Sequence, residues 1–161
     1  MRNSDQLTLD KKNIDTILVL DFGSQYTQLI ARRIRELDVF SVILPWDISK
    51  ERITALNPVG IILSGGPESV TNKNTPRIPK IILDLEIPIL GICYGMQTLA
   101  EQFGGQVTAS KSKEFGHASI TIETACILFD GLDTRSSIDV WMSHGDHVSA
   151  LPDQFNLIAS T

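Results

Sequence analysis

Four short apolar runs without polar alternation constrain the fold of this chain more than any other feature. They are rich in β-branched residues and occupy residues 16–21, 41–44, 59–65 and 87–93. Strands that are buried on both faces have this pattern, which is typical of a parallel sheet covered by helices. Helices are expected between and after the runs, at residues 26–37, 49–56, 76–86 and 95–103. The alternation predicts an α/β fold with a doubly wound, mostly parallel sheet and flanking helices, whose ligands bind at the carboxyl ends of the strands.

The pattern changes after Gly105. Shorter runs at residues 106–109, 117–122, 139–143 and 155–160 are separated by Asp and Gly turns. They predict short, partly antiparallel strands that are added to the main sheet. Residues 1–15 are polar and are interpreted as a loose N-terminal leader, which leaves one domain over residues 16–161. The last run is unfinished at Thr161, so we expect this domain to be incomplete at its C-terminus.

Composition excludes several classes of protein. Lys and Arg number 14 against 19 Asp and Glu, and a net charge of −5 gives no footprint for a nucleic-acid partner. No apolar stretch approaches the roughly 20 residues that span a bilayer, and no signal-peptide core is present. We therefore expect a cytoplasmic protein with no membrane partner.

No metal site is predicted either. Cys93 and Cys126 do not have metal-binding or redox spacing, and Cys126 is interpreted as a small core residue. His144 and His147 are three residues apart, but no third ligand is indicated.

Cys93 lies directly after the fourth apolar run, in the pattern Gly-x-Cys-x-Gly formed with Gly91 and Gly95. This is the cysteine form of the nucleophile elbow, a strained strand-to-helix turn that lifts a side chain clear of the sheet. The start of the following helix stabilises a thiolate and lowers the pKa of the thiol. Spacing alone leaves open the alternative of a buried cysteine before an ordinary loop.

Two further loops follow buried strands and converge on the same edge of the sheet. Residues 64–67, Ser-Gly-Gly-Pro, form a glycine turn that can point a backbone N–H at the substrate of Cys93. An acyl-transfer enzyme needs two such donors to stabilise the oxyanion of its tetrahedral intermediate. A plain turn is the alternative interpretation. The other loop, residues 21–26, has no role assigned by its composition.

Four segments together closely resemble the class I (triad) glutamine amidotransferases, and within them the N-terminal glutaminase domains of the GMP synthase family. These segments are residues 18–36, 62–70, 91–100 and 141–148. The resemblance runs from about residue 16 to the end of the chain and implies a flavodoxin-like fold. It also implies that Cys93 attacks the side-chain amide of glutamine, releases ammonia and leaves a γ-glutamyl thioester that water hydrolyses.

The resemblance assigns roles to further residues. Gly66 and Tyr94 match the positions whose N–H groups form the oxyanion hole. Gln97 matches the position that holds the amino-acid end of the substrate. The segment that binds the α-amino and α-carboxylate groups is matched by Ser143, His144, Gly145 and Asp146.

One expected element is missing from the sequence. Family members carry a His-Pro-Glu motif whose histidine is the general base, but His117, His144 and His147 are not followed by Pro-Glu. Truncation before the motif is the favoured interpretation, and takeover by His144 or His147 is the alternative. The fragment alone is therefore predicted to have little or no glutaminase activity.

In the complete protein the resemblance implies a synthetase domain in the same chain that uses ATP, Mg²⁺ and XMP to make GMP, and a homodimer. No cofactor is expected in the part given by this sequence. Two other functions stay open: a different elbow cysteine amidase or hydrolase, and a non-catalytic glutamine-binding module.

Overall fold

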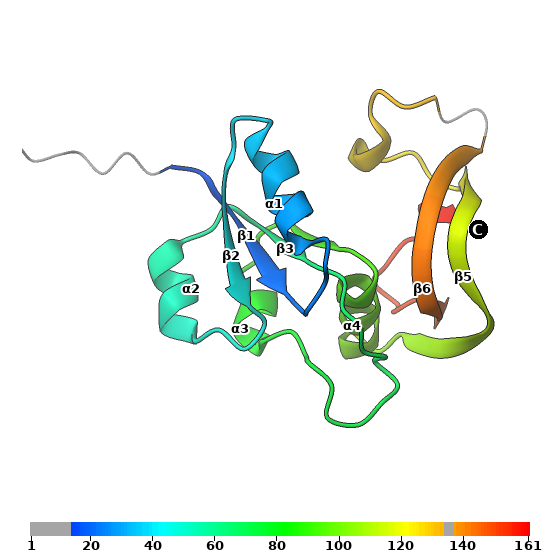
Figure 1. The fold of residues 1–161 in the computed structure, drawn as a ribbon, viewed down its shortest axis with the longest axis horizontal. Coiled ribbons are helices and arrows are strands. Elements are labelled where there is room, and N and C mark those ends of the chain that lie inside the picture. Colours follow the sequence, from blue (N-terminus) through cyan, green and yellow to red (C-terminus); the bar gives the residue numbers. More distant parts are fainter. Residues whose placement is uncertain (1–13, 134–136) are drawn as a thin grey trace, which may run out of the picture.

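The computed structural model of the chain describes residues 14–133 and 137–161, without the side chains of residues 110–115 and His144. Most of the predicted leader, residues 1–13, lies outside the described residues. Four parallel strands form the main sheet in the order β2-β1-β3-β4 (Figure 1). Their bounds are Thr16–Asp21 for β1, Phe40–Pro45 for β2, Gly60–Leu63 for β3 and Ile89–Gly91 for β4.

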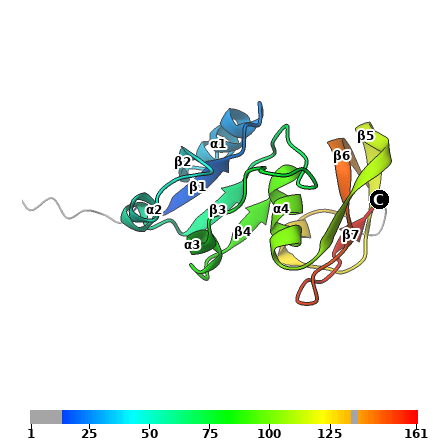
Figure 2. The same ribbon diagram turned by 90° about the horizontal axis from the view of Figure 1, so that it is seen from below.

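Helices cover both faces of this sheet. Their bounds are Thr27–Arg35 for α1, Lys50–Leu56 for α2, Lys80–Leu83 for α3 and Tyr94–Gln102 for α4. Helix α1 lies on one face, whereas α2 and α3 lie on the other (Figures 1 and 2). Right-handed crossovers require this arrangement, because the chain moves from β1 to β2 in one direction and then back across β1 to β3. The predicted doubly wound α/β fold is confirmed.

Helix α3 is much shorter than the predicted helix at residues 76–86. Pro79 is its N-cap, with extended backbone angles (φ −56°, ψ 134°). A proline also disfavours helical angles in the residue before it, here Ile78. Glu86 has a φ of 52°, in the left-handed region, so a right-handed helix cannot continue through the end of the predicted stretch. The prolines therefore keep residues 76–79 in a loop.

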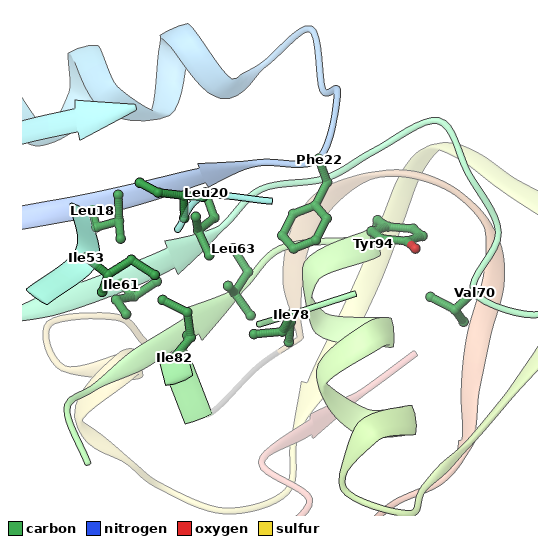
Figure 3. Close-up of a cluster of buried hydrophobic side chains, with 11 residues drawn as sticks. Leu18, Leu20, Phe22, Ile53, Ile61, Leu63, Val70, Ile78, Ile82 and Tyr94 are labelled. Carbon is green, nitrogen blue, oxygen red and sulfur yellow. The ribbon is translucent and has the colours of Figure 1, made fainter. Parts of the chain in front are cut away.

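The buried core lies between the sheet and α2 and α3, and it continues to the carboxyl ends of the strands. Leu18, Leu20, Ile61 and Leu63 point from β1 and β3 toward Ile53 and Ile82 (Figure 3). Each fully buried side chain of this kind stabilises the fold by about 1.5–3 kcal/mol. At the far end of the cluster, the rings of Phe22 and Tyr94 pack with their centroids 5.5 Å apart. The core thus supports the loops that follow β1 and β4.

A second sheet follows α4, with strand order β6-β5-β7 and antiparallel pairing. Its strands are β5 (Gln106–Ile122), β6 (Ile138–Ala150) and β7 (Ala159–Ser160). Antiparallel pairing after residue 105 is confirmed, but two of these strands are long and the sheet is separate from the main one. Helix α4 lies between the two sheets (Figure 2).

Two smaller expectations also need revision. The runs at 106–109 and 117–122 belong to one 17-residue strand, because both pair with β6; the pairing is interrupted after Ala109 and resumes at Glu114 with a register shift. Cys126 is only half-buried, and it precedes a short turn at Ile127–Phe129 rather than entering the core. Among the described residues, no helix has the length and apolar character needed to cross a membrane.

Candidate active site

Cys93 occupies the sharp turn between β4 and α4. Its backbone angles are φ 48° and ψ −112°, which an L-residue other than glycine rarely adopts. A strained backbone of this kind costs about 1–3 kcal/mol and is found preferentially at functional sites. The observed angles agree with the elbow interpretation of Cys93.

The two flanking glycines are required by close contacts. A Cβ atom at Gly91 would lie 2.6 Å from the Cα atom of Met96, and one at Gly95 would lie 2.4 Å from the carbonyl oxygen of Leu63. Real Cβ atoms do not come this close to backbone atoms, so neither position accepts a side chain. The glycines let the first turn of α4 pack directly against β3 and β4.

A pocket of about 290 Å³ opens beside Cys93. It lies at the carboxyl ends of β1, β3 and β4, where the strand order reverses and α/β sheets bind ligands. Its lining consists of residues 23–26 after β1, residues 65–67 after β3, Cys93, and Ser143 of β6. This volume lies at the lower limit of the volumes usual for small-molecule sites, which suits a ligand the size of an amino acid.

The predicted oxyanion-hole residues, Gly66 and Tyr94, flank the nucleophile position. Tyr94 is the first residue of α4, so its N–H has no acceptor within the helix. Over the described ranges, neither this N–H nor that of Gly66 donates a hydrogen bond to a protein atom. The Tyr94 side chain is buried, and its hydroxyl donates to the Pro76 carbonyl at 2.5 Å. Only the backbone of Tyr94 is therefore available to a ligand.

Gln97 is buried and does not line the pocket. Its Nε2 donates a hydrogen bond to the carbonyl oxygen of Asp146 at 2.9 Å. This bond joins α4 to β6 across 49 residues of sequence. Direct contact between Gln97 and a substrate stays a prediction, whereas its contact with the predicted substrate-binding segment is present.

The predicted segment 143–146 comes from β6. Ser143 lines the pocket, Gly145 is half-buried and Asp146 is 8% exposed. The prediction for the His144 side chain lies outside the described residues. The second sheet thus brings part of this segment to the elbow.

No general base lines the described pocket. Its lining residues include no histidine, acid or lysine. His147 is exposed and lies 3.2 Å from the Thr108 hydroxyl. His117 pairs with Asp139 at 3.3 Å on an exposed face. Neither of these histidines is placed to act on Cys93.

Burial raises the pKa of the Cys93 thiol. This direction is opposite to the lowering that we expected from the helix N-terminus. The thiol is half-buried among loop residues, and burial disfavours the charged thiolate. A thiol that stays protonated reacts slowly unless a base removes its proton.

The family model "Glutamine amidotransferase class-I" matches residues 18–161. The chain belongs to the class-I glutamine amidotransferase family. This membership confirms the predicted resemblance and covers both sheets of the fold.

Relatives within this amidotransferase family are named GMP synthase. The chain is 55% identical over 158 residues to "GMP synthase [glutamine-hydrolyzing]" of Hamiltonella defensa, which covers 93% of the chain and 30% of the relative. The protein of the same name from Photorhabdus laumondii is 53% identical over 151 residues, 90% of the chain and 29% of the relative. The chain thus spans about 30% of the length of these curated relatives.

A solved structure shows the same amidotransferase fold. It is the crystal structure of a protein from Thermoplasma acidophilum that is described as one subunit of a GMP synthase, with a TM-score of 0.77 and 36% identity. The match covers 92% of this chain and 73% of that one.

No role was predicted for the loop after β1, yet residues 23–26 line the pocket of this amidotransferase. The Asp21 carboxylate shapes this loop by accepting hydrogen bonds from the Gly23 N–H at 2.9 Å and the Thr27 hydroxyl at 2.8 Å. The signal that could have identified this loop as part of the pocket was its position directly after the first buried strand.

Proposed function

We propose that this chain is the glutaminase part of a GMP synthase, in which Cys93 attacks the side-chain amide of glutamine. The observation that carries the proposal is the strained Cys93 backbone beside a small pocket with two unused N–H groups. The names of the relatives support glutamine as the substrate.

The reaction begins when a base removes the thiol proton and the sulfur adds to the amide carbon. A C–S bond forms and the carbonyl electrons move to oxygen, where the Gly66 and Tyr94 N–H groups stabilise the charge. Collapse of this intermediate breaks the C–N bond, and the nitrogen takes a proton and leaves as ammonia. Water then attacks the thioester, the C–S bond breaks, and glutamate and the thiol are released. Loss of one oxyanion donor typically costs about 10²–10³-fold in kcat.

The segment of β6 at the pocket would hold the amino-acid end of glutamine. Asp146, a nearly buried residue of this segment, has an acidic side chain of the kind that binds an α-ammonium group. Ser143 lies at the pocket wall and offers a hydroxyl, and we assign the backbone groups of His144 and Gly145, the next two residues of β6, to the same role. Gln97 would act here by fixing the Asp146 carbonyl.

The base would come from the part of the longer protein that this chain does not cover. A thiol with a raised pKa needs one, and the described pocket lining offers none. We assign the synthetase reaction of XMP with ATP and Mg²⁺ to the same part of the longer protein, which this chain does not cover. Among the described residues, no group of three His, Cys, Asp or Glu side chains is placed to hold a metal ion. A homodimer and a cytoplasmic location complete the proposal.

A second candidate is a non-catalytic glutamine-binding module. The lack of a base among the pocket-lining residues favours it. It requires the same pocket but no turnover, so measurements of binding and of ammonia release separate the two functions.

Ammonia release from glutamine tests the proposal. The 161-residue chain should release almost none, whereas the longer protein should release ammonia and lose at least about 10³-fold of its kcat as the Cys93→Ala variant. Ammonia release that survives Cys93→Ala would contradict the assignment. Glutamine binding without turnover by the longer protein would establish the binding module instead.

A further inference from the structure

Ser64, the first residue of the Ser-Gly-Gly-Pro loop, is fully buried and all of its polar groups are bonded. Its N–H donates to the Leu20 carbonyl at 3.0 Å, and its carbonyl accepts from the Gly95 N–H at 3.0 Å. Its hydroxyl accepts from the Phe22 N–H at 3.0 Å and donates to the Gly65 carbonyl at 2.9 Å. One serine therefore connects the loop after β1, the loop after β3 and the elbow.

The bond to the Gly65 carbonyl has a geometric consequence. The Gly65 carbonyl and the Gly66 N–H belong to one trans peptide group, so they point to opposite sides of it. The Ser64 hydroxyl holds the carbonyl on the interior side, because this hydroxyl is itself inaccessible to solvent. The Gly66 N–H is thereby directed to the opposite side of the peptide group, and both glycines line the pocket.

Glycine on both sides of this peptide group makes such a restraint necessary. Glycine has the widest choice of backbone angles, and a peptide group between two glycines turns over readily without a partner. The peptide group is also close to the nucleophile, since a Cβ atom at Gly65 would lie 3.5 Å from the Cβ atom of Cys93. A turn of the peptide group would put a carbonyl oxygen where the oxyanion needs a donor.

We propose that Ser64 is a positioning residue for the oxyanion hole, whose hydroxyl locks the Gly65–Gly66 peptide group with its N–H toward the carbonyl that Cys93 attacks. This role rests on the proposed glutaminase function. Ser64 also accepts a hydrogen bond from Gly95 at the start of α4, and this bond fixes α4 relative to the same loop. Ser64 therefore helps to position both oxyanion donors.

The test compares two buried serines in the longer glutaminase. Ser64→Ala should lower kcat for glutamine hydrolysis by about 10–100-fold and change KM by less than about threefold, because the oxyanion exists only after the substrate has bound. Ser41→Ala is the matched control. Ser41 is also buried and its hydroxyl donates to the Ala31 carbonyl at 3.0 Å, away from the pocket. It should leave kcat within about twofold of the unsubstituted protein.

Ser64→Cys provides a second variant if the alanine protein does not fold. It keeps the side-chain size but has a weak donor, so kcat should fall in the same direction by a smaller factor. An unchanged kcat in Ser64→Ala or in the folded Ser64→Cys variant, or a loss confined to KM, would overturn the role of Ser64 alone. No ammonia release from the unsubstituted protein would overturn the proposed function and this role with it.

Discussion

Two opposing effects act on the pKa of the Cys93 thiol. The first turn of α4 favours the thiolate, whereas burial raises the pKa of the thiol. A raised pKa keeps the thiol protonated at neutral pH, so its reactivity should be low there and should rise as the pH increases.

We predict that iodoacetamide alkylates Cys93 in this chain with a pH midpoint above the value of about 8.5 found for an exposed cysteine. The reaction is followed by mass spectrometry in a Cys126→Ala background, so that one thiol remains. A midpoint at or below neutral pH would show that the helix end outweighs burial and that no separate base is needed.

Gly66 lies against the backbone of the preceding loop. A Cβ atom there would come within 2.7 Å of the Phe22 carbonyl oxygen, whereas one at Gly65 makes only ordinary contacts at 3.5 Å. Gly66→Ala should therefore lower the free energy of unfolding by about 1–3 kcal/mol, and Gly65→Ala by less. Denaturant unfolding of the two variants checks this prediction. Equal stability of the two would mean that the loop moves freely away from Phe22.

Gln97 and Gln102 both extend from α4 to the backbone of a neighbouring segment. Gln97 bonds to Asp146 of β6, and Gln102 exchanges hydrogen bonds of 2.8 and 3.1 Å with Ile78 of the loop before α3. The first contact joins α4 to the strand that carries the pocket residue Ser143, whereas the second attaches the loop before α3.

Gln97→Leu should raise KM for glutamine in the longer protein by about tenfold, since it removes the hydrogen-bond donor of the Asp146 carbonyl in the predicted binding segment. Gln102→Leu is the matched control and should lower stability by about 1–3 kcal/mol without changing KM. Steady-state kinetics and thermal unfolding of both variants give the comparison. A similar change in KM for both would assign the effect to α4 as a whole.

Some of these elements were predictable from the sequence and others were not. Strand β1 was predicted with its observed bounds and the elbow at Cys93 from three residues, because burial on both faces and a glycine-flanked turn are local signals. The length of β5 was not predictable, since its two apolar runs form one strand only through their common pairing with β6. The bond from Gln97 to Asp146 likewise depends on how the second sheet packs against α4, which spacing along the chain does not report.

The pocket is assembled from both sheets. The main sheet supplies three loops and the second sheet supplies Ser143, with α4 between them. A ligand that contacts both sheets should stabilise the folded chain as a unit.

We predict that glutamine raises the free energy of unfolding of this chain by about 2.7 kcal/mol at a concentration of roughly 100 times its Kd. Asp146→Asn should remove most of this gain, and D-glutamine serves as the control ligand. Denaturant unfolding with and without each ligand is the measurement. No stabilisation by saturating L-glutamine would mean that the described pocket does not hold the substrate by itself.

The most direct test of Cys93 as the nucleophile of a glutamine pocket is its alkylation by a chloroketone analogue of glutamine. Peptide mass spectrometry at alkaline pH should find Cys93 modified far faster than Cys126, and glutamine should slow the reaction at Cys93 alone. Equal modification of both cysteines, or a rate at Cys93 that glutamine leaves unchanged, would contradict this account.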